Sequence, residues 1–246
     1  MRQQKRETPW FQHWFDENYL ILYRHRNRSE AKKQVQLIID TLNPSRDTTI
    51  LDLACGEGRY TVLFDEMGYR VTGLDLSETL VTRGREKYPQ LDLKVGDMRH
   101  IPGKFDLILS LFTSFGYFET DEENEEVVRS VYEALNPGGV YWLDFLNAQE
   151  VESNLVPESV SQLSTEIRVI ENRKIKNGRI IKDIHFKNNG EEKCYTESVR
   201  LFTCSQLQEM FKRTGFQLIH CFGDYQGTEW TPESPRTILI GIKKLK

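Results

Sequence analysis

Short apolar segments alternate with segments of helical periodicity along most of the chain. Segments of strand character lie at 50–53, 70–74, 91–95, 105–109, 140–145, 216–222 and 237–243. Apolar positions at helical spacing predict helices at 29–41, 59–67, 77–88 and 121–135, and a last helix, capped by Thr203 or Ser205, that ends near 214. This alternation predicts an α/β fold built on one sheet, with helices that connect its strands.

The pattern changes between residues 151 and 200, which are more polar. Two Asn-Gly pairs, at 177–178 and 189–190, separate runs of strand composition at 167–175, 179–186 and 194–201. Asn-Gly between such runs is the strongest short-range signal for a β-hairpin. We therefore predict a three-stranded antiparallel insertion, which covers a substrate, pairs subunits or does neither.

Large aromatic residues are concentrated near the N-terminus. Trp10 and Trp14, and Phe15 and Tyr19, are each four positions apart, which places each pair on one helix face. One interpretation is a helix packed on the domain. The other is a lid over a ligand, because aromatic faces attract cations. The basic run at 24–28 that follows is typical of a solvated surface.

Residues suited to ligand binding lie where the predicted strands end. Gly56 and Gly58 follow the first strand and lead into a helix, which lets a ligand approach the backbone and the helix N-terminus. Asp75 ends the second strand and Asp97 follows the third. A carboxylate after the second strand is placed to accept from ribose hydroxyls. Taken singly, the glycines fit an ordinary turn and the acids fit helix caps.

The glycine turn departs from the dinucleotide-binding fingerprint. Thr61 stands where that fingerprint has its third glycine, and Glu57 would repel a pyrophosphate. The pattern favours a ligand with adenosine at one end and no phosphate. The motifs DLACGEG (52–58), GLDLS (73–77), GDM (96–98) and NPGG (136–139) together resemble the ordered motifs of class I S-adenosylmethionine-dependent methyltransferases over about residues 48–146.

The resemblance implies a Rossmann-like, seven-stranded, mostly parallel sheet with a final antiparallel strand, helices on both faces and a small antiparallel β insertion. It divides the chain into an N-terminal helical lid (1–45), an S-adenosylmethionine-binding core (46–150), the β insertion (151–202) and a C-terminal helix and strands that complete the core (203–246). S-adenosylmethionine would lie at the strand ends, and S-adenosylhomocysteine would be the product.

The resemblance also implies roles for individual residues. Asp75 would accept from both ribose hydroxyls, and Asp97 would accept from the adenine amino group with Met98 against the ring. The cation of Arg59 opposes the dipole at a helix start, which indicates a partner: the methionine carboxylate, or a salt bridge such as one to Glu57. The expected cofactor-binding residues are Tyr23, Asp52, Ala54, Gly56, Gly58, Arg59, Asp75, Leu76, Asp97, Met98, Ser110 and Leu111.

Two loops are candidates for the acceptor pocket. In the loop at 110–118, we expect Phe112 and Phe115 in the core and Tyr117 at the site. The loop at 223–236 is long and contains aromatic residues. One interpretation is that it lines the pocket, and the other is that it is an ordered surface loop. The expected substrate-lining residues are Tyr117, Tyr225, Trp230 and Arg236. Tyr117, Asp144 and His220 are possible bases, but none stands out, so no catalytic residue is assigned.

Composition limits the partners. The net charge of −4 argues against a broad nucleic-acid footprint. The four cysteines lie at no CxxC spacing, so no metal site is predicted, and scattered thiols favour a cytoplasmic location. No signal-peptide core and no membrane span is evident. The oligomeric state, monomer or homodimer, stays open.

These observations predict in-line transfer of a methyl group from S-adenosylmethionine to an oxygen or nitrogen atom of an unidentified small molecule. Such a reaction depends mainly on the alignment of the reactants. The alternatives are a protein that binds S-adenosylmethionine without catalysis, an RNA methyltransferase supported by the basic run at 24–28, and an NAD-dependent oxidoreductase.

Overall fold

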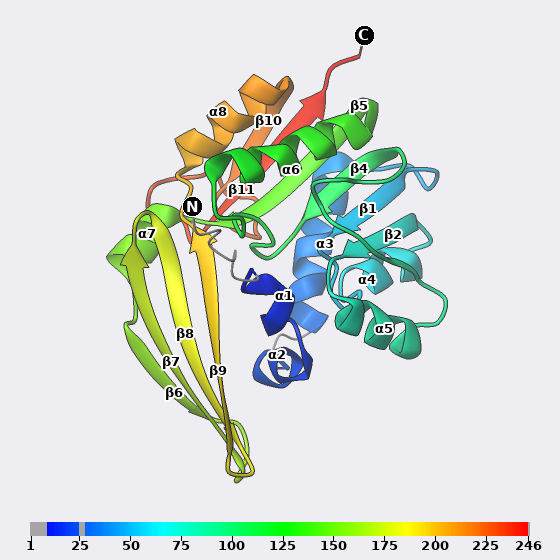
Figure 1. Ribbon diagram of the computed structural model, residues 1–246. Helices are drawn as coiled ribbons and strands as arrows, with labels where there is room; N and C mark the ends of the chain where they lie inside the picture. Colours follow the sequence, from blue (N-terminus) through cyan, green and yellow to red (C-terminus); the bar gives the residue numbers. More distant parts are fainter. Residues whose placement is uncertain (1–8, 25–27, 246) are drawn as a thin grey trace, which may run out of the picture.

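Seven strands form one mixed sheet in the order β10-β11-β5-β4-β1-β2-β3 (Figure 1). The computed structural model describes residues 9–24 and 28–245. The strands of this sheet are β1 (Thr49–Leu53), β2 (Arg70–Asp75), β3 (Asp92–Val95), β4 (Phe105–Ser110), β5 (Leu135–Leu146), β10 (Phe216–Phe222) and β11 (Arg236–Lys243). All neighbouring pairs are parallel except the two that involve β11. The predicted Rossmann-like sheet is confirmed.

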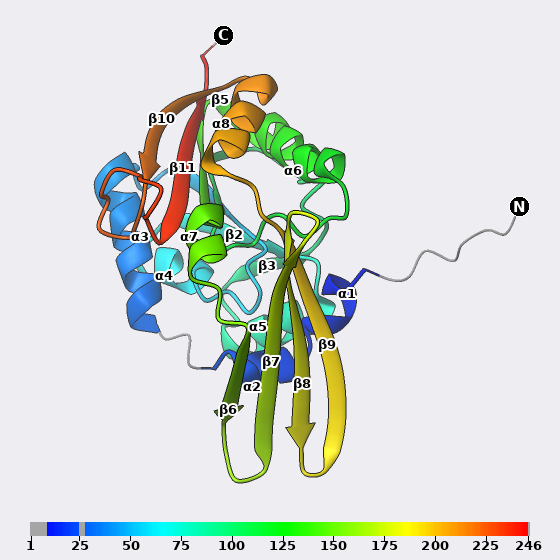
Figure 2. The same cartoon turned by 90° about the vertical axis from the view of Figure 1, so that its left-hand side faces the viewer.

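Helices cover both faces of this sheet (Figures 1 and 2). They are α3 (Arg28–Leu42), α4 (Thr61–Glu66), α5 (Glu78–Lys87), α6 (Asp121–Ala134) and α8 (Cys204–Thr214). Alternate strand residues point to opposite faces, so Leu51 packs with α6 and α8, and Ile50 packs with α3 and α4. Both cores are fully buried, which fixes the register of the sheet.

Local sequence signals mark where the helices begin and end, as predicted. Thr203, one of the two predicted caps, starts α8 with a reciprocal capping box, and its side chain accepts from the amide of Gln206. Gly215 ends the same helix with φ of 109°, a conformation that favours glycine. Ser77 caps α5 as predicted and accepts from the amide of Leu80.

The carboxyl ends of β1, β2 and β4 meet at one edge of the sheet. Leu53 pairs with Leu74 on one side and with Ser110 on the other. The segments that follow these three strands therefore lie side by side, and in open α/β sheets this edge is where ligands bind.

A separate antiparallel sheet lies between β5 and α8 in the chain and projects from the main body (Figure 2). It contains β6 (Glu158–Gln162), β7 (Ile167–Lys176), β8 (Arg179–Asn188) and β9 (Glu191–Arg200). The β insertion is confirmed, but the prediction of three strands is wrong because β6 adds a fourth. Its sequence, ESVSQ, is polar, as an edge strand with both faces partly solvated allows.

Two short N-terminal helices, α1 (Phe11–Trp14) and α2 (Glu17–Leu22), lie between the main body and the antiparallel sheet (Figure 1). Trp14 and Leu22 form a third small core with Val169, Ile184 and Phe186 of that sheet. We call residues 9–24, which contain both helices, the strap. Part of the predicted lid, residues 1–8, and two members of the basic run, His25 and Arg26, lie outside the described residues.

Two further features differ from the predicted elements. β5 begins at Leu135 rather than at residue 140, and a register shift between its pairs with Phe105 and Leu107 accommodates the NPGG segment. A short helix, α7 (Ala148–Ser153), follows β5.

In the described part of the chain, no helix has the length and apolar character needed to cross a membrane.

Candidate functional site

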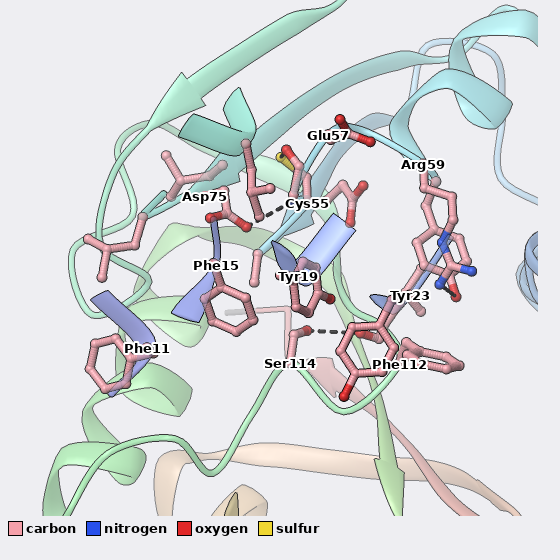
Figure 3. A pocket seen from close by; sticks show the side chains of 18 of the residues that line it. Phe11, Phe15, Tyr19, Tyr23, Cys55, Glu57, Arg59, Asp75, Phe112 and Ser114 are labelled. Carbon is pink, nitrogen blue, oxygen red and sulfur yellow. Dashed lines mark hydrogen bonds between the residues drawn. The ribbon is translucent and has the colours of Figure 1, made fainter. Parts of the chain in front are cut away.

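A cavity of about 690 Å³ opens where β1, β2 and β4 end, and the strap covers it. This volume lies within the range of about 300–1,000 Å³ typical of small-molecule sites. Figure 3 shows Asp75, Cys55 and Arg59 on one wall, with Phe15, Tyr19 and Tyr23 of the strap close by. The predicted site residues that line it are Tyr23, Asp52, Ala54, Gly56, Arg59, Asp75, Leu76, Asp97, Met98, Leu111 and Tyr117.

The glycine turn and Asp75 are joined by hydrogen bonds. The amide of Gly56 donates to Asp75 Oδ2 at 2.8 Å, and the amide of Ser77 donates to Oδ1 at 2.8 Å. Burial raises the pKa of Asp75. Each carboxylate oxygen accepts about two hydrogen bonds, so both oxygens retain capacity for a ligand.

The turn itself needs unusual backbone angles. Ala54, Gly56 and Gly58 have φ of 60°, 57° and 83°. Gly58 does not line the cavity. It lies behind the turn, where an added Cβ would approach Leu91 Cδ1 to 3.1 Å. Both the positive φ and the close packing therefore require glycine at position 58.

Arg59 carries a buried hydrogen-bond donor toward the cavity region. Its Nη2 donates to the Tyr60 hydroxyl at 2.8 Å, and that hydroxyl donates to Gln34 Oε1 at 2.5 Å. Arg59 Nη1 is buried and is one of four buried side-chain polar atoms without a partner among the described residues. Glu57, the alternative partner, pairs with Arg83 and Lys87. A buried cationic donor in a cavity wall fits the carboxylate of a methionine moiety.

Asp52 is buried beside this donor. Its Oδ2 accepts from the amide of Thr61 at 3.1 Å and from the Thr61 hydroxyl at 2.7 Å. Burial raises its pKa to about 6, against the opposing effect of these hydrogen bonds. Asp52 therefore titrates near neutral pH, and a bound cation would favour its charged form.

Asp97 lines the cavity but already has a strong partner. Arg99 Nη2 donates to Asp97 Oδ2 at 2.6 Å, and the amide of Arg99 donates to Oδ1 at 2.8 Å. Burial alone would raise the pKa of Asp97, but the hydrogen bonds from Arg99 outweigh it and hold the pKa below its usual value. Asp97 is a carboxylate at neutral pH, and a ligand donor would share it with Arg99.

The strap contributes an aromatic wall. The Trp10 ring lies 5.1 Å from that of Tyr117, and the Phe15 ring lies 4.9 Å from that of Tyr19. Trp10 Nε1 is another buried donor without a partner in the described structure. Residues of this segment line the cavity and also pack against the core of the domain, and its role as a lid stays a prediction.

Glu197 of β9 binds the strap to the antiparallel sheet. Its Oε1 accepts from Trp14 Nε1 at 2.6 Å and from the Tyr23 hydroxyl at 2.8 Å. Lys182 Nζ lies 2.6 Å from Oε2. Glu197 and its neighbour on the same strand face, Val199, line the cavity. Sequence reasoning missed both, because nothing in a hairpin sequence indicates which strand face meets another domain.

The loop after β4 forms another wall. Phe115 is buried as expected, with 1% exposed. Phe112 is partly buried and packs against the core, and it also lines the cavity. Phe112 and Thr113 have φ of 56° and 65°. Such angles cost about 1–3 kcal/mol for a non-glycine residue and persist only where neighbours enforce them. No glycine marks this turn in the sequence.

Five predicted site residues lie outside the cavity lining: Gly58, Ser110, Tyr225, Trp230 and Arg236. The Ser110 hydroxyl is buried 3.0 Å from that of Tyr141. Trp230 Nε1 donates to the Thr237 hydroxyl at 3.0 Å. Tyr225 and Arg236 bind Asp144 behind the wall, because the 223–236 loop folds toward β5 rather than over the cavity.

The possible bases separate in the same way. Tyr117 lines the cavity. Asp144 is buried in an ion pair with Arg236, and His220 is exposed on β10 and stacks 5.2 Å from Phe222. Within the described residues, no cluster of three or more acidic, cysteine or histidine side chains is arranged to bind a metal ion.

Comparison with known proteins places these motifs in context. The family described as "Methyltransferase domain" matches residues 50–139. YqeM of Bacillus subtilis (strain 168), which is named a methyltransferase, is 31% identical over 202 residues, or 76% of this chain and 81% of that protein. The dTDP-3-amino-3,4,6-trideoxy-alpha-D-glucopyranose N,N-dimethyltransferase of Streptomyces venezuelae is 40% identical over 95 residues, or 38% of this chain and 40% of that one.

The fold also resembles solved structures. A S-adenosylmethionine-dependent methyltransferase from Clostridium acetobutylicum ATCC 824 superposes with a TM-score of 0.81 at 19% identity, and the match covers 93% of this chain and 98% of that one. At 19% identity this similarity shows a shared fold, and the shared fold extends over nearly the whole of both chains.

Proposed function

This chain belongs to the class I S-adenosylmethionine-dependent methyltransferases, and from that premise we propose that its methyl acceptor is a small-molecule amine bound beneath the strap. Membership makes it an enzyme with S-adenosylmethionine as methyl donor, and it favours this reaction over NAD chemistry or binding without catalysis. The finer statements below concern where the two reactants lie.

The observation that carries the proposal is the continuity of the cavity. The same space is lined by Asp75 at the end of β2, by Arg59 after the glycine turn, and by the aromatic residues Trp10 of the strap and Tyr117 of the loop after β4. We assign the strand-end part to the donor and the aromatic part to the acceptor. A covered cavity of this size suits a metabolite better than a nucleic acid, as does the negative net charge.

We assign the donor contacts to residues with remaining capacity. Asp75 accepts the ribose hydroxyls with the lone pairs that Gly56 and Ser77 leave available, and Arg59 donates from Nη1 to the methionine carboxylate. Asp97 and Met98 face the adenine. When bound, S-adenosylmethionine supplies a methyl group activated by its positively charged sulfur.

The chain mainly aligns the reactants and excludes water. Alignment of this kind supplies at most about 7–11 kcal/mol of barrier reduction. A neutral amine attacks through its nitrogen lone pair and loses a proton to solvent after the transfer, whereas a hydroxyl is a weak nucleophile until a base removes its proton. An amine acceptor would need none of the possible bases, of which only Tyr117 lines the cavity, and we therefore assign nitrogen as the acceptor atom. The dimethyltransferase relative from Streptomyces venezuelae, whose name specifies N-methylation of an amino sugar, supports the same choice.

The test is a methyl-transfer assay with labelled S-adenosylmethionine against paired metabolites that differ only in an amino or hydroxyl group. We expect label in amines and not in their hydroxyl counterparts, with RNA neither labelled nor inhibitory. Labelling of hydroxyl compounds alone would overturn the nitrogen assignment, and labelling of RNA would overturn the small-molecule assignment.

A further inference from the structure

Two consecutive residues of the cavity wall, Phe112 and Thr113, adopt left-handed backbone angles without glycine. Threonine is branched at Cβ and is especially disfavoured at φ of 65°. Something other than local preference must therefore hold this wall in place.

Asp144, near the end of β5, holds both residues. The amide of Phe112 donates to Asp144 Oδ2 at 2.8 Å, and the amide of Thr113 donates to the Asp144 carbonyl at 3.0 Å. Asp144 is 1% exposed, so water does not compete for the atoms that form these hydrogen bonds.

Two residues from the C-terminal part of the chain orient Asp144. Arg236 Nε donates to Asp144 Oδ1 at 2.8 Å, and its Nη2 donates to the Thr113 hydroxyl at 2.9 Å. The Tyr225 hydroxyl donates to Asp144 Oδ2 at 2.9 Å. Burial and the neighbouring carboxylate raise the pKa of Tyr225, which keeps its proton for this bond.

Arg236 also lies near the donor end of the wall. Its guanidinium carbon is 5.9 Å from the centre of the Phe112 ring, and that of Arg59 is 5.1 Å from the same ring. Phe112 thus lies close both to the arginine assigned to the methionine carboxylate and to the arginine behind the wall. A shift of the 112–113 backbone would move the surface against which Arg59 packs.

We propose that Asp144, Arg236 and Tyr225 are positioning residues that hold Phe112 and Thr113 in the left-handed shape against which the methionine end of the donor binds. None of the three lines the cavity, so they act through the 112–113 backbone. This inference rests on the proposed location of the donor, and it assigns a role to the 223–236 loop.

A matched pair of variants tests the backbone argument. Thr113→Val and Thr113→Gly both remove the hydroxyl that Arg236 binds, but only valine retains the strain, because glycine adopts positive φ readily. Affinity for S-adenosylhomocysteine is measured by calorimetry, which needs no acceptor. We expect Thr113→Val to weaken binding at least tenfold, and Thr113→Gly to weaken it at least threefold less.

The same logic predicts rescue. We expect Arg236→Met to weaken binding at least tenfold and Arg236→Met/Thr113→Gly to recover part of that loss. Tyr225→Phe removes one hydrogen bond and should weaken binding about threefold in a folded protein. Arg173→Met is the control, because Arg173 is similarly buried and pairs with Glu171 at 2.7 Å within the antiparallel sheet. Melting temperatures identify variants that fail to fold.

Equal affinities of Thr113→Val and Thr113→Gly, or no recovery in the folded double variant, would overturn the positioning role. Failure of the wild-type protein to bind S-adenosylhomocysteine would instead contradict the assigned donor site. The two failures are therefore distinguishable.

Discussion

The carboxylate of Asp75 accepts the amide hydrogen of Gly56 at 2.8 Å. This hydrogen bond joins the end of β2 to the glycine turn after β1, and the amide of Ser77 holds the second oxygen at 2.8 Å. The acid assigned to the ribose is thus fixed by the turn assigned to the methionine part. The two halves of the donor site form one unit.

Asp75→Asn is expected to damage this unit. The amide nitrogen of asparagine would face the N–H of Gly56 or of Ser77, and the charge that strengthens a ribose contact is lost. Affinity for S-adenosylhomocysteine should fall about 10- to 100-fold, in line with hydrogen bonds to a charged group at roughly 1.5–3 kcal/mol. Calorimetry measures the loss. Asp47→Asn, an acid whose side chain is 87% exposed, is the control, and an unchanged affinity of Asp75→Asn would refute the ribose role.

Arg59→Met should remove recognition of the methionine carboxylate. We expect S-adenosylmethionine to bind about tenfold or more weakly, while decarboxylated S-adenosylmethionine, which lacks that group, binds the variant and the wild type alike. Stability should fall by roughly 1.5–3 kcal/mol at most, because the Nη2 hydrogen bond to the Tyr60 hydroxyl is lost, whereas Nη1 has no partner to lose in the described structure. Arg46→Met, at an arginine 4.8 Å over the Tyr69 ring, is the control. Equal losses for both ligands would contradict the carboxylate assignment.

The regular elements could be predicted because local patterns determine them. The segment 216–222 is a strand with the predicted bounds, since its composition and the preceding Gly215 leave few alternatives. β6 was missed because its polar sequence has one exposed residue at every second position and lies at a sheet edge. Short edge strands are stabilised by their neighbour more than by their own residues.

The donor side of the site could be predicted for a related reason. Residues that directly follow parallel strands must lie at one edge, so Asp75 and Gly56 were placed by topology alone. The positions of Tyr225 and Arg236 could not be predicted, because the path of their loop depends on Asp144, which is distant in the sequence. The left-handed turn at Phe112 likewise depends on that long-range contact rather than on a local signal.

Donor binding should depend on pH through Asp52. Burial raises the pKa of this acid to about 6, and the positive amino group of a methionine moiety would favour the carboxylate. Affinity for S-adenosylhomocysteine should therefore increase from pH 5 to 7, with proton release near pH 6. Calorimetry in buffers of different ionisation enthalpy measures the released proton. Asp52→Asn should lack this pH dependence, and its persistence would assign it to another group.

The same pKa shift has a consequence for stability. Between the unfolded pKa of about 4 and the folded value of about 6, the folded state keeps a proton that the unfolded chain has lost. Unfolding free energy therefore falls as pH rises through this window. In Asp52→Asn this contribution is absent, so relative to wild type its unfolding free energy should rise by roughly 2–3 kcal/mol from pH 4 to 7. Urea denaturation at the two pH values measures the difference, and a constant difference would contradict it.

The hydrogen bonds between Glu197 and the strap should limit the rate at which the ligand dissociates. The strap binds the antiparallel sheet through partly buried contacts, such as the hydrogen bond that Trp14 Nε1 donates to Glu197 Oε1 at 2.6 Å. On the side of α5, the Ser77 hydroxyl donates to the carbonyl of Phe15 in the strap at 2.8 Å, and Glu17 of the strap forms an exposed ion pair with Arg83.

Trp14→Phe keeps an aromatic ring but removes a hydrogen bond to a charged group, which contributes roughly 1.5–3 kcal/mol. Dissociation of S-adenosylhomocysteine should become about tenfold faster in stopped-flow measurements. Glu17→Gln, which removes only the exposed ion pair with Arg83, should leave the rate unchanged. A faster rate in Glu17→Gln alone would indicate that the strap opens from α5 and that the Glu197 contact does not limit release.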